Sequence, residues 1–131
     1  MFNKRTEKLR KLMAEKNIEA LWVTQEENRY YLSGFTGDSG QLLVTATEQF
    51  LLTDGRFIEQ AQKEAPDYQV TDIGNNFWGQ MGNILAVVGI KKLSFEAQHL
   101  TYATYKKLVE QVQEWRQPIK TEPTEGLVEK L

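Results

Sequence analysis

The chain has 131 residues, 40% of them hydrophobic and 26% charged, which is the composition of one folded domain of ordinary size. Its net charge of −2 argues against a nucleic-acid or anionic-membrane partner, because such partners bind a positive surface. Cysteine is absent and histidine occurs once, which excludes disulfides, thiolate nucleophiles, cysteine-ligated metals and two-histidine metal motifs.

Helix-like and strand-like periodicity alternates along the chain. In order, the sequence predicts a helix over 3–16, a strand over 20–24, a hairpin of strands 41–45 and 49–53, a helix over 55–65, a strand over 68–73, a helix over 76–88, a strand over 92–96, a helix over 101–115 and an edge strand over 118–121. This alternation predicts an α/β three-layer sandwich, with helices on both faces of a mixed, mainly parallel sheet of about five or six strands.

Local signals mark the ends of several of these elements. Asn3 is expected to cap the first helix, and Asn17 to end it in the left-handed conformation. Asp54 is expected to cap the helix over 55–65, which Pro66 ends. No apolar run reaches the roughly 18 residues of a membrane span, and the charged residues 1–7 do not form a secretion signal. We therefore expect a cytoplasmic protein.

The most distinctive segment, residues 28–40, reads Asn-Arg-Tyr-Tyr-Leu-Ser-Gly-Phe-Thr-Gly-Asp-Ser-Gly. Its three glycines, Gly34, Gly37 and Gly40, predict a loop that needs positive φ or close backbone approach. Alternatively, the backbone amides of such a loop can hold an anion. Residues 37–40 also match the nucleophile segment of trypsin-like serine proteases, but the single histidine, the short chain and the alternating helices and strands exclude that class.

A second compact motif is Thr-Asp-Gly-Arg-Phe at residues 53–57. A strand end, a turn and a helix cap account for its first three residues. Arg56 can bind a carboxylate ligand with its forked guanidinium, or pair with Asp54 or Glu59 within the chain. His99, which precedes the last helix, is expected to be a capping or surface residue. No catalytic residue is predicted, because these side chains assemble no catalytic set.

The two motifs together, in this order and separated by a strand pair, resemble the amino-terminal domain of the prolidase, aminopeptidase P and creatinase family. The segment Ile-Glu-Ala-Leu-Trp-Val-Thr at residues 18–24 fits the same pattern, and the resemblance covers essentially the whole chain. It implies an α/β domain over residues 1–123, with residues 124–131 beginning a linker to an absent catalytic metallopeptidase domain.

The resemblance also implies an activity and partners. The parent protein would be a metal-dependent peptidase cleaving Xaa-Pro bonds in proline-containing peptides, with two divalent metals (Mn, Co or Zn) in the catalytic domain. This chain would hold no cofactor and would be inactive alone. Its partners would be its own carboxy-terminal catalytic domain and a second subunit of a homodimer. Creatinase needs no metal, so this domain by itself does not define the substrate class.

In the family, the loop after the Tyr-Leu-Ser-Gly-Phe segment overhangs the active site of the partner subunit. Carried onto this sequence, that lid is Phe35, Thr36, Gly37, Asp38 and Ser39. Phe57 stands where the family more often has tyrosine. Two alternatives remain open: a self-contained small-molecule or nucleotide-binding module that uses the loop from Gly34 to Gly40, and a docking domain of a catalytically dead homologue.

Overall fold

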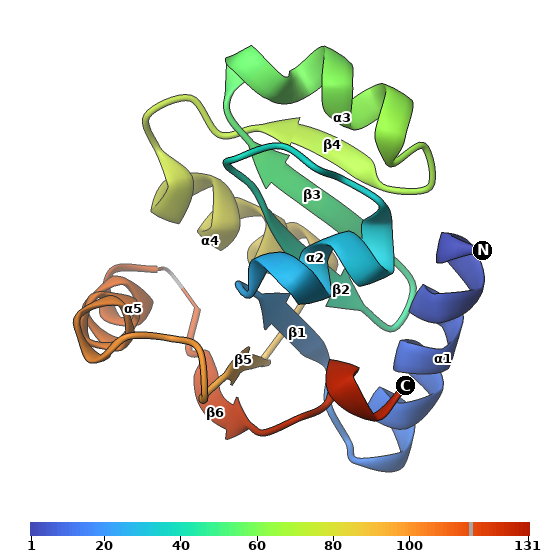
Figure 1. The fold of residues 1–131 in the computed structure, drawn as a ribbon. Coiled ribbons are helices and arrows are strands. Elements are labelled where there is room, and N and C mark those ends of the chain that lie inside the picture. Colours follow the sequence, from blue (N-terminus) through green and yellow to red (C-terminus); the bar gives the residue numbers. More distant parts are fainter. Residues whose placement is uncertain (116) are drawn as a thin grey trace.

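The computed structural model describes residues 1–115 and 117–131. Helices and strands alternate along these residues (Figure 1). In chain order they are α1 (Phe2–Glu15), β1 (Ala20–Val23), α2 (Glu26–Ser33), β2 (Gln41–Thr45), β3 (Gln49–Thr53), η1 (Gly55–Phe57), α3 (Ile58–Glu64), β4 (Gln69–Asp72), α4 (Phe77–Val88), β5 (Lys92–Glu96), α5 (Tyr102–Glu114), β6 (Lys120–Thr124) and η2 (Val128–Lys130), where η denotes a single 3₁₀ turn.

The strands form one six-stranded sheet in the order β4-β3-β2-β1-β5-β6. The pairs β1–β2 and β2–β3 are antiparallel, whereas β3–β4, β1–β5 and β5–β6 are parallel. The predicted mixed, mainly parallel sheet is therefore confirmed. Its central strands are covered on both faces, as expected for strands that read as continuous apolar runs.

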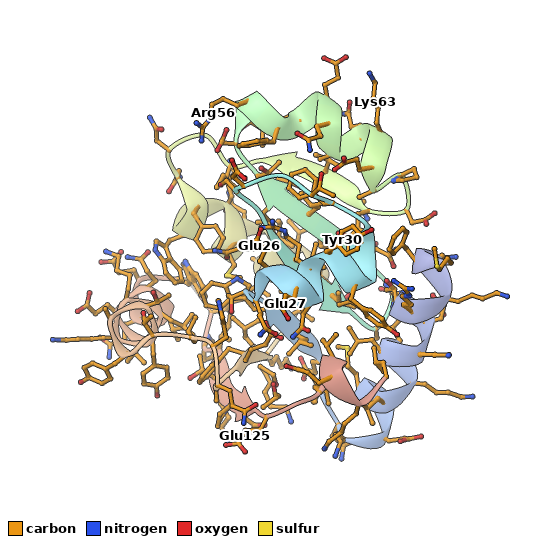
Figure 2. The ribbon with its side chains drawn as sticks, in the orientation of Figure 1. Glu26, Glu27, Tyr30, Arg56, Lys63 and Glu125 are labelled. Atoms are coloured by element: carbon orange, nitrogen blue, oxygen red, sulfur yellow. The ribbon has the colours of Figure 1, made fainter. Side chains whose placement is uncertain are left out.

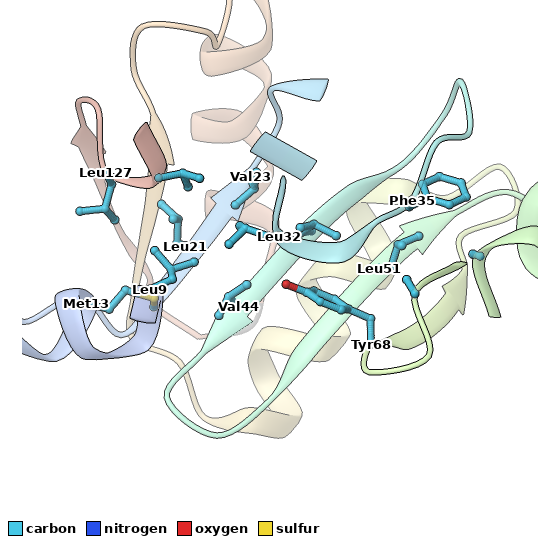
Figure 3. Close-up of a cluster of buried hydrophobic side chains, with 14 residues drawn as sticks. Leu9, Met13, Leu21, Val23, Leu32, Phe35, Val44, Leu51, Tyr68 and Leu127 are labelled. Carbon is cyan, nitrogen blue, oxygen red and sulfur yellow. The ribbon is translucent and has the colours of Figure 1, made fainter. Parts of the chain in front are cut away.

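Two hydrophobic clusters, one on each face of the sheet, pack the sheet against its helices. The three predicted layers are therefore present. In β1, Leu21 and Val23 pack on one face while Ala20 and Trp22 pack on the other, because successive side chains of a strand alternate. The first cluster joins the sheet to α1, α2, α3 and η2 (Figure 3). The second joins it to α4 and α5. Figure 1 shows α2 in front of the sheet and α4 behind it.

The hairpin and several helix ends form where the sequence predicts them. Strands β2 and β3 have the predicted bounds, with Gln41 opposite Leu52 in an antiparallel register. Asn17 has φ +56°, and Ile18 N donates to the Met13 carbonyl at 2.9 Å, which closes the end of α1. Asp54 caps the turn that leads into α3 by accepting from Arg56 N at 3.0 Å.

Two expectations are wrong, and one helix was not predicted. Helix α2 (Glu26–Ser33) lies where the sequence predicted no element, whereas the predicted loop from Gly34 to Gly40 lies outside regular structure. Asn3 does not cap α1, since the helix already includes Phe2. The last edge strand is β6 (Lys120–Thr124) rather than residues 118–121, because its register follows the parallel pairing with β5. Its edge position still accommodates Pro123.

Residues 125–131 pack against the body of the domain. Leu127 and Val128 are buried in the same cluster as Leu9 and Met13 of α1 (Figure 3). The segment that the sequence assigns to the start of a linker therefore contributes to the core beneath α1.

Candidate functional site

The two motifs singled out in the sequence lie side by side where β2 begins and β3 ends. The loop of residues 34–40, called the glycine loop below, enters β2, and the turn of residues 53–57 leaves β3. Because β2 and β3 are antiparallel neighbours, the start of one strand lies beside the end of the other. The Thr53 hydroxyl joins the two segments by donating to the Ser39 carbonyl at 2.5 Å.

The start of helix α2 is held by the buried carboxylate of Glu96, at the end of β5. Glu96 accepts hydrogen bonds from the backbone N–H groups of Thr24 and Gln25 at 2.8 and 2.9 Å. It also accepts one from the Asn28 amide at 2.6 Å. These bonds satisfy donors around the start of α2 that have no partner within the helix. The other end of α2 closes with Gly34 at φ +83°, a left-handed cap that favours glycine.

Arg29 of α2 lies inside the glycine loop. Its side chain is only 5% exposed. One terminal nitrogen donates to the Gly40 carbonyl at 2.7 Å and the other donates to the Gly37 carbonyl. Burial lowers the pKa of the Arg29 guanidinium because the charged form is less well solvated there. The loop carbonyls thus surround a cation that the chain itself supplies.

The Phe35 ring fills the space beneath the loop. It is fully buried and lies 5.3 Å from the Arg29 guanidinium carbon, within the range of a cation–π contact. A Cβ atom on Gly37 would overlap this ring, and one on Gly40 would lie 3.0 Å from it. Both glycines are therefore explained by close approach to Phe35.

A second set of hydrogen bonds ties the outside of the loop to α3. Glu64 accepts from the Thr36 backbone N–H at 2.8 Å and from the Thr36 hydroxyl. Gln60 donates to the Thr36 hydroxyl at 3.1 Å. The bond from the Thr36 backbone is the main reason that the pKa of Glu64 is lowered. The loop is therefore fastened from both sides.

Arg56 pairs with Asp54. Its Nε and Nη2 atoms donate to the two Asp54 carboxylate oxygens at 3.0 and 3.1 Å, the intrachain alternative that the sequence left open. This hydrogen bonding lowers the pKa of Asp54 and raises that of Arg56. The Arg56 side chain remains 77% exposed and projects from the upper edge of the domain (Figure 2).

The structure divides the five expected lid residues into two groups. Thr36 and Asp38 are exposed and Ser39 is half-buried, whereas Phe35 and Gly37 are buried. In this conformation the outward-facing chemistry of the loop is the Asp38 carboxylate together with the hydroxyls. Phe35 acts from below as support for the backbone.

The described residues contain no group of three or more histidine, cysteine, aspartate or glutamate side chains placed to hold a metal ion. His99 is exposed and its Nδ1 lies 2.9 Å from the Thr24 hydroxyl. An anion cradle needs free N–H groups, but the loop carbonyls of Gly37, Ser39 and Gly40 converge on donors. This geometry does not favour an anion-binding loop.

Sequence reasoning missed the roles of Asn28, Arg29 and Glu96. The adjacent pair Asn28–Arg29 lies on one helix and links it in two directions, to β5 through Glu96 and to the glycine loop. The distance of Glu96 along the sequence left no local signal of this link. Within residues 1–115 and 117–131, no helix has the length and apolar character needed to cross a bilayer.

The mixed six-stranded sheet with its covering helices is the fold of a known class of domain. Residues 5–131 match the family model described as the creatinase/prolidase N-terminal domain, and the chain belongs to that family.

Comparison with known proteins supports this assignment. An uncharacterized peptidase of Bacillus subtilis is 31% identical over 99 residues, which cover 76% of this chain and 28% of that protein. A solved Xaa-Pro dipeptidase from Bacillus anthracis matches with TM-score 0.88 and 32% identity, over 99% of this chain and 35% of that one. The N-terminal domain of the cytoplasmic peptidase PepQ from Mycobacterium tuberculosis matches with TM-score 0.86 and 29% identity, over 97% of both chains. This chain thus spans about a third or less of the two longer proteins.

Proposed function

We propose that this chain is the non-catalytic N-terminal domain of a metal-dependent Xaa-Pro peptidase. Family membership and similarity to an Xaa-Pro dipeptidase over about a third of that protein's length support the proposal. The metal ligands and the catalytic groups would belong to a separate catalytic domain. The relative described as a cytoplasmic peptidase supports a cytoplasmic location.

We propose further that the domain forms part of a homodimer and closes the substrate pocket of the partner subunit with the glycine loop. The supporting observation is a loop fastened from inside by Arg29 and from outside by Glu64, which leaves Asp38 exposed. A rigid wall over a pocket excludes water and positions substrate without a large ordering cost. A carboxylate on that wall attracts the protonated amino terminus of a peptide.

Asp38→Asn in the full-length protein tests the lid role. We expect KM for an Xaa-Pro dipeptide to rise about tenfold with kcat within twofold, because the lost charge contributes to substrate binding in ground state and transition state alike. Asp67→Asn is the matched control, since Asp67 is also an exposed aspartate but lies in the turn before β4. An unchanged KM in the Asp38 variant would remove the lid role.

A mixing experiment tests whether the loop acts across the dimer. Subunits carrying Asp38→Asn are combined with subunits that have the native loop but are inactivated in the catalytic domain. In the mixed dimer, the active catalytic domain then faces a native loop from its partner. Recovery of the native KM supports action across the dimer, whereas persistence of the variant KM assigns the loop to its own subunit.

A further inference from the structure

The Arg29 guanidinium is a buried positive charge without a buried carboxylate partner. Its only carboxylate within ion-pair distance among the described residues is Glu26, at 3.8 Å, and the Glu26 side chain is 76% exposed. Burial of a charge is costly unless polar groups inside the protein replace the lost water. The role of Arg29 therefore follows from the groups that accept its hydrogen bonds in place of water.

Those groups come mainly from the glycine loop. The two terminal nitrogens of Arg29 donate to the carbonyls of Gly37 and Gly40, and the guanidinium lies near the Phe35 ring. The planar fork of arginine reaches both carbonyls at once, which the single nitrogen of lysine does not. The buried charge and this loop conformation therefore depend on each other.

In the sequence, Asp38 lies between Gly37 and Gly40, whose carbonyl groups accept hydrogen bonds from Arg29. The backbone is fixed at Gly37 before it and at Gly40 after it, and Thr53 holds the intervening Ser39 carbonyl. The aspartate is thus presented outward from a segment with little freedom of its own, although the segment is rich in glycine.

We propose that Arg29 is a positioning residue that locks the glycine loop and thereby fixes the direction in which Asp38 faces. Its effect on substrate rests on the proposed lid function, whereas its effect on the loop does not. Loss of the fork releases the Gly37 and Gly40 carbonyls together, so the loop moves while the sheet keeps its structure.

Backbone order parameters from ¹⁵N relaxation of the 131-residue chain test the lock directly. In the native chain we expect values near 0.85 at Gly37, Asp38 and Ser39, and in Arg29→Met values below about 0.6, typical of flexible backbone. Arg29→Lys retains the charge but loses the second hydrogen bond, and should give intermediate values. If Arg29→Met does not fold, Arg29→Lys alone decides. Native order parameters in the variant that folds would overturn the proposal.

Arg10 provides the matched control. It also lies on a helix and donates from Nε to a backbone carbonyl, that of Thr45 at 2.9 Å, but at the opposite end of β2 from the loop. Arg10→Met should lower stability and leave the order parameters of residues 37–39 unchanged. If the loop loosens equally in both variants, the effect is a general loss of stability and the proposal fails.

Kinetics of the full-length protein separate this proposal from the proposed function. If both hold, Arg29→Lys raises KM for an Xaa-Pro dipeptide severalfold with kcat within twofold, and Arg10→Lys does not. If the loop is loosened in the Arg29 variant but the kinetics are native, the positioning role of Arg29 is supported and the lid function is contradicted. A loop that stays ordered in Arg29→Lys and Arg29→Met removes the lock, whatever the kinetics of Asp38→Asn.

Discussion

At the scale of single residues, the role of a polar side chain in this domain depends on its hydrogen-bonding partners and on its burial. Arg56 is paired with an aspartate two positions away, and Arg29 is surrounded by carbonyls. Tyr68 is a third case. Its hydroxyl is buried in the first hydrophobic cluster (Figure 3), where its one polar partner in the described structure is the Thr6 hydroxyl at 2.8 Å. Burial, the larger effect, raises the pKa of Tyr68 to about 12.

This shift predicts a loss of stability in alkaline solution. The ordinary pKa of a tyrosine hydroxyl is 10.0 and that of Tyr68 in the folded state is about 12, so between these pH values the folded state retains a proton that the unfolded state has lost. The free energy of unfolding therefore falls as pH rises through this window, by about 2–3 kcal/mol in total. Urea unfolding at pH 8 to 12 measures it. Tyr68→Phe should lack this part of the decline, and a native pH dependence in that variant would contradict the assignment.

At the scale of elements, α2 depends on the sheet more than on its own sequence. Gln25, its cap residue, makes no capping bond with its side chain, and the carboxylate of Glu96 takes that place from β5. The helix in turn carries Arg29 into the glycine loop. Figure 1 shows this arrangement as α2 lying across the sheet with the loop running from its end toward β3.

Removing the Glu96 carboxylate should lower the stability of the domain, because the start of α2 loses its acceptor. Glu96→Ala leaves the N–H groups of Thr24 and Gln25 and the Asn28 amide without their acceptor, at a cost of about 2–4 kcal/mol. Urea denaturation of the 131-residue chain measures this cost. The control is Glu122→Ala on the neighbouring strand, where a half-exposed ion pair with Lys92 at 3.8 Å is lost, and where we expect less than about 0.5 kcal/mol. A difference below that value for Glu96→Ala would refute the capping role.

At the scale of the whole molecule, the domain has a core of two hydrophobic clusters, and its described residues contain no group of three or more histidine, cysteine, aspartate or glutamate side chains that could hold a metal ion. Crystal structures of relatives' domains of the same extent, such as the PepQ N-terminal domain, match it over nearly their whole length. Under the proposed function, this domain is a scaffold that shapes the pocket of a catalytic domain with its glycine loop.

The 131-residue chain alone should therefore hydrolyse no Xaa-Pro dipeptide when Mn²⁺, Co²⁺ or Zn²⁺ is added. The physical reason is that polarising an amide bond requires a bound metal or an activated nucleophile. The measurement is release of free proline, compared with a blank that contains metal and substrate only. The same metals should leave Tm within about 1 °C, since only a ligand that binds the folded state raises it. Turnover above the blank would contradict the non-catalytic assignment.

Local patterns in the sequence determined the α/β class, the β2–β3 hairpin and the caps at Asn17 and Asp54, because each depends on residues a few positions apart. The resemblance to the family likewise depended on motifs that are contiguous in the chain. Only the tertiary structure decided that residues 28–33 are helical, that Phe35 supports the loop from beneath, and that Arg29 is enclosed by it. These features depend on burial and on contacts between distant parts of the chain. The carboxylate at the start of α2, for example, comes from about seventy positions further along the chain. Helical and strand periodicity gives no information about contacts over such a separation.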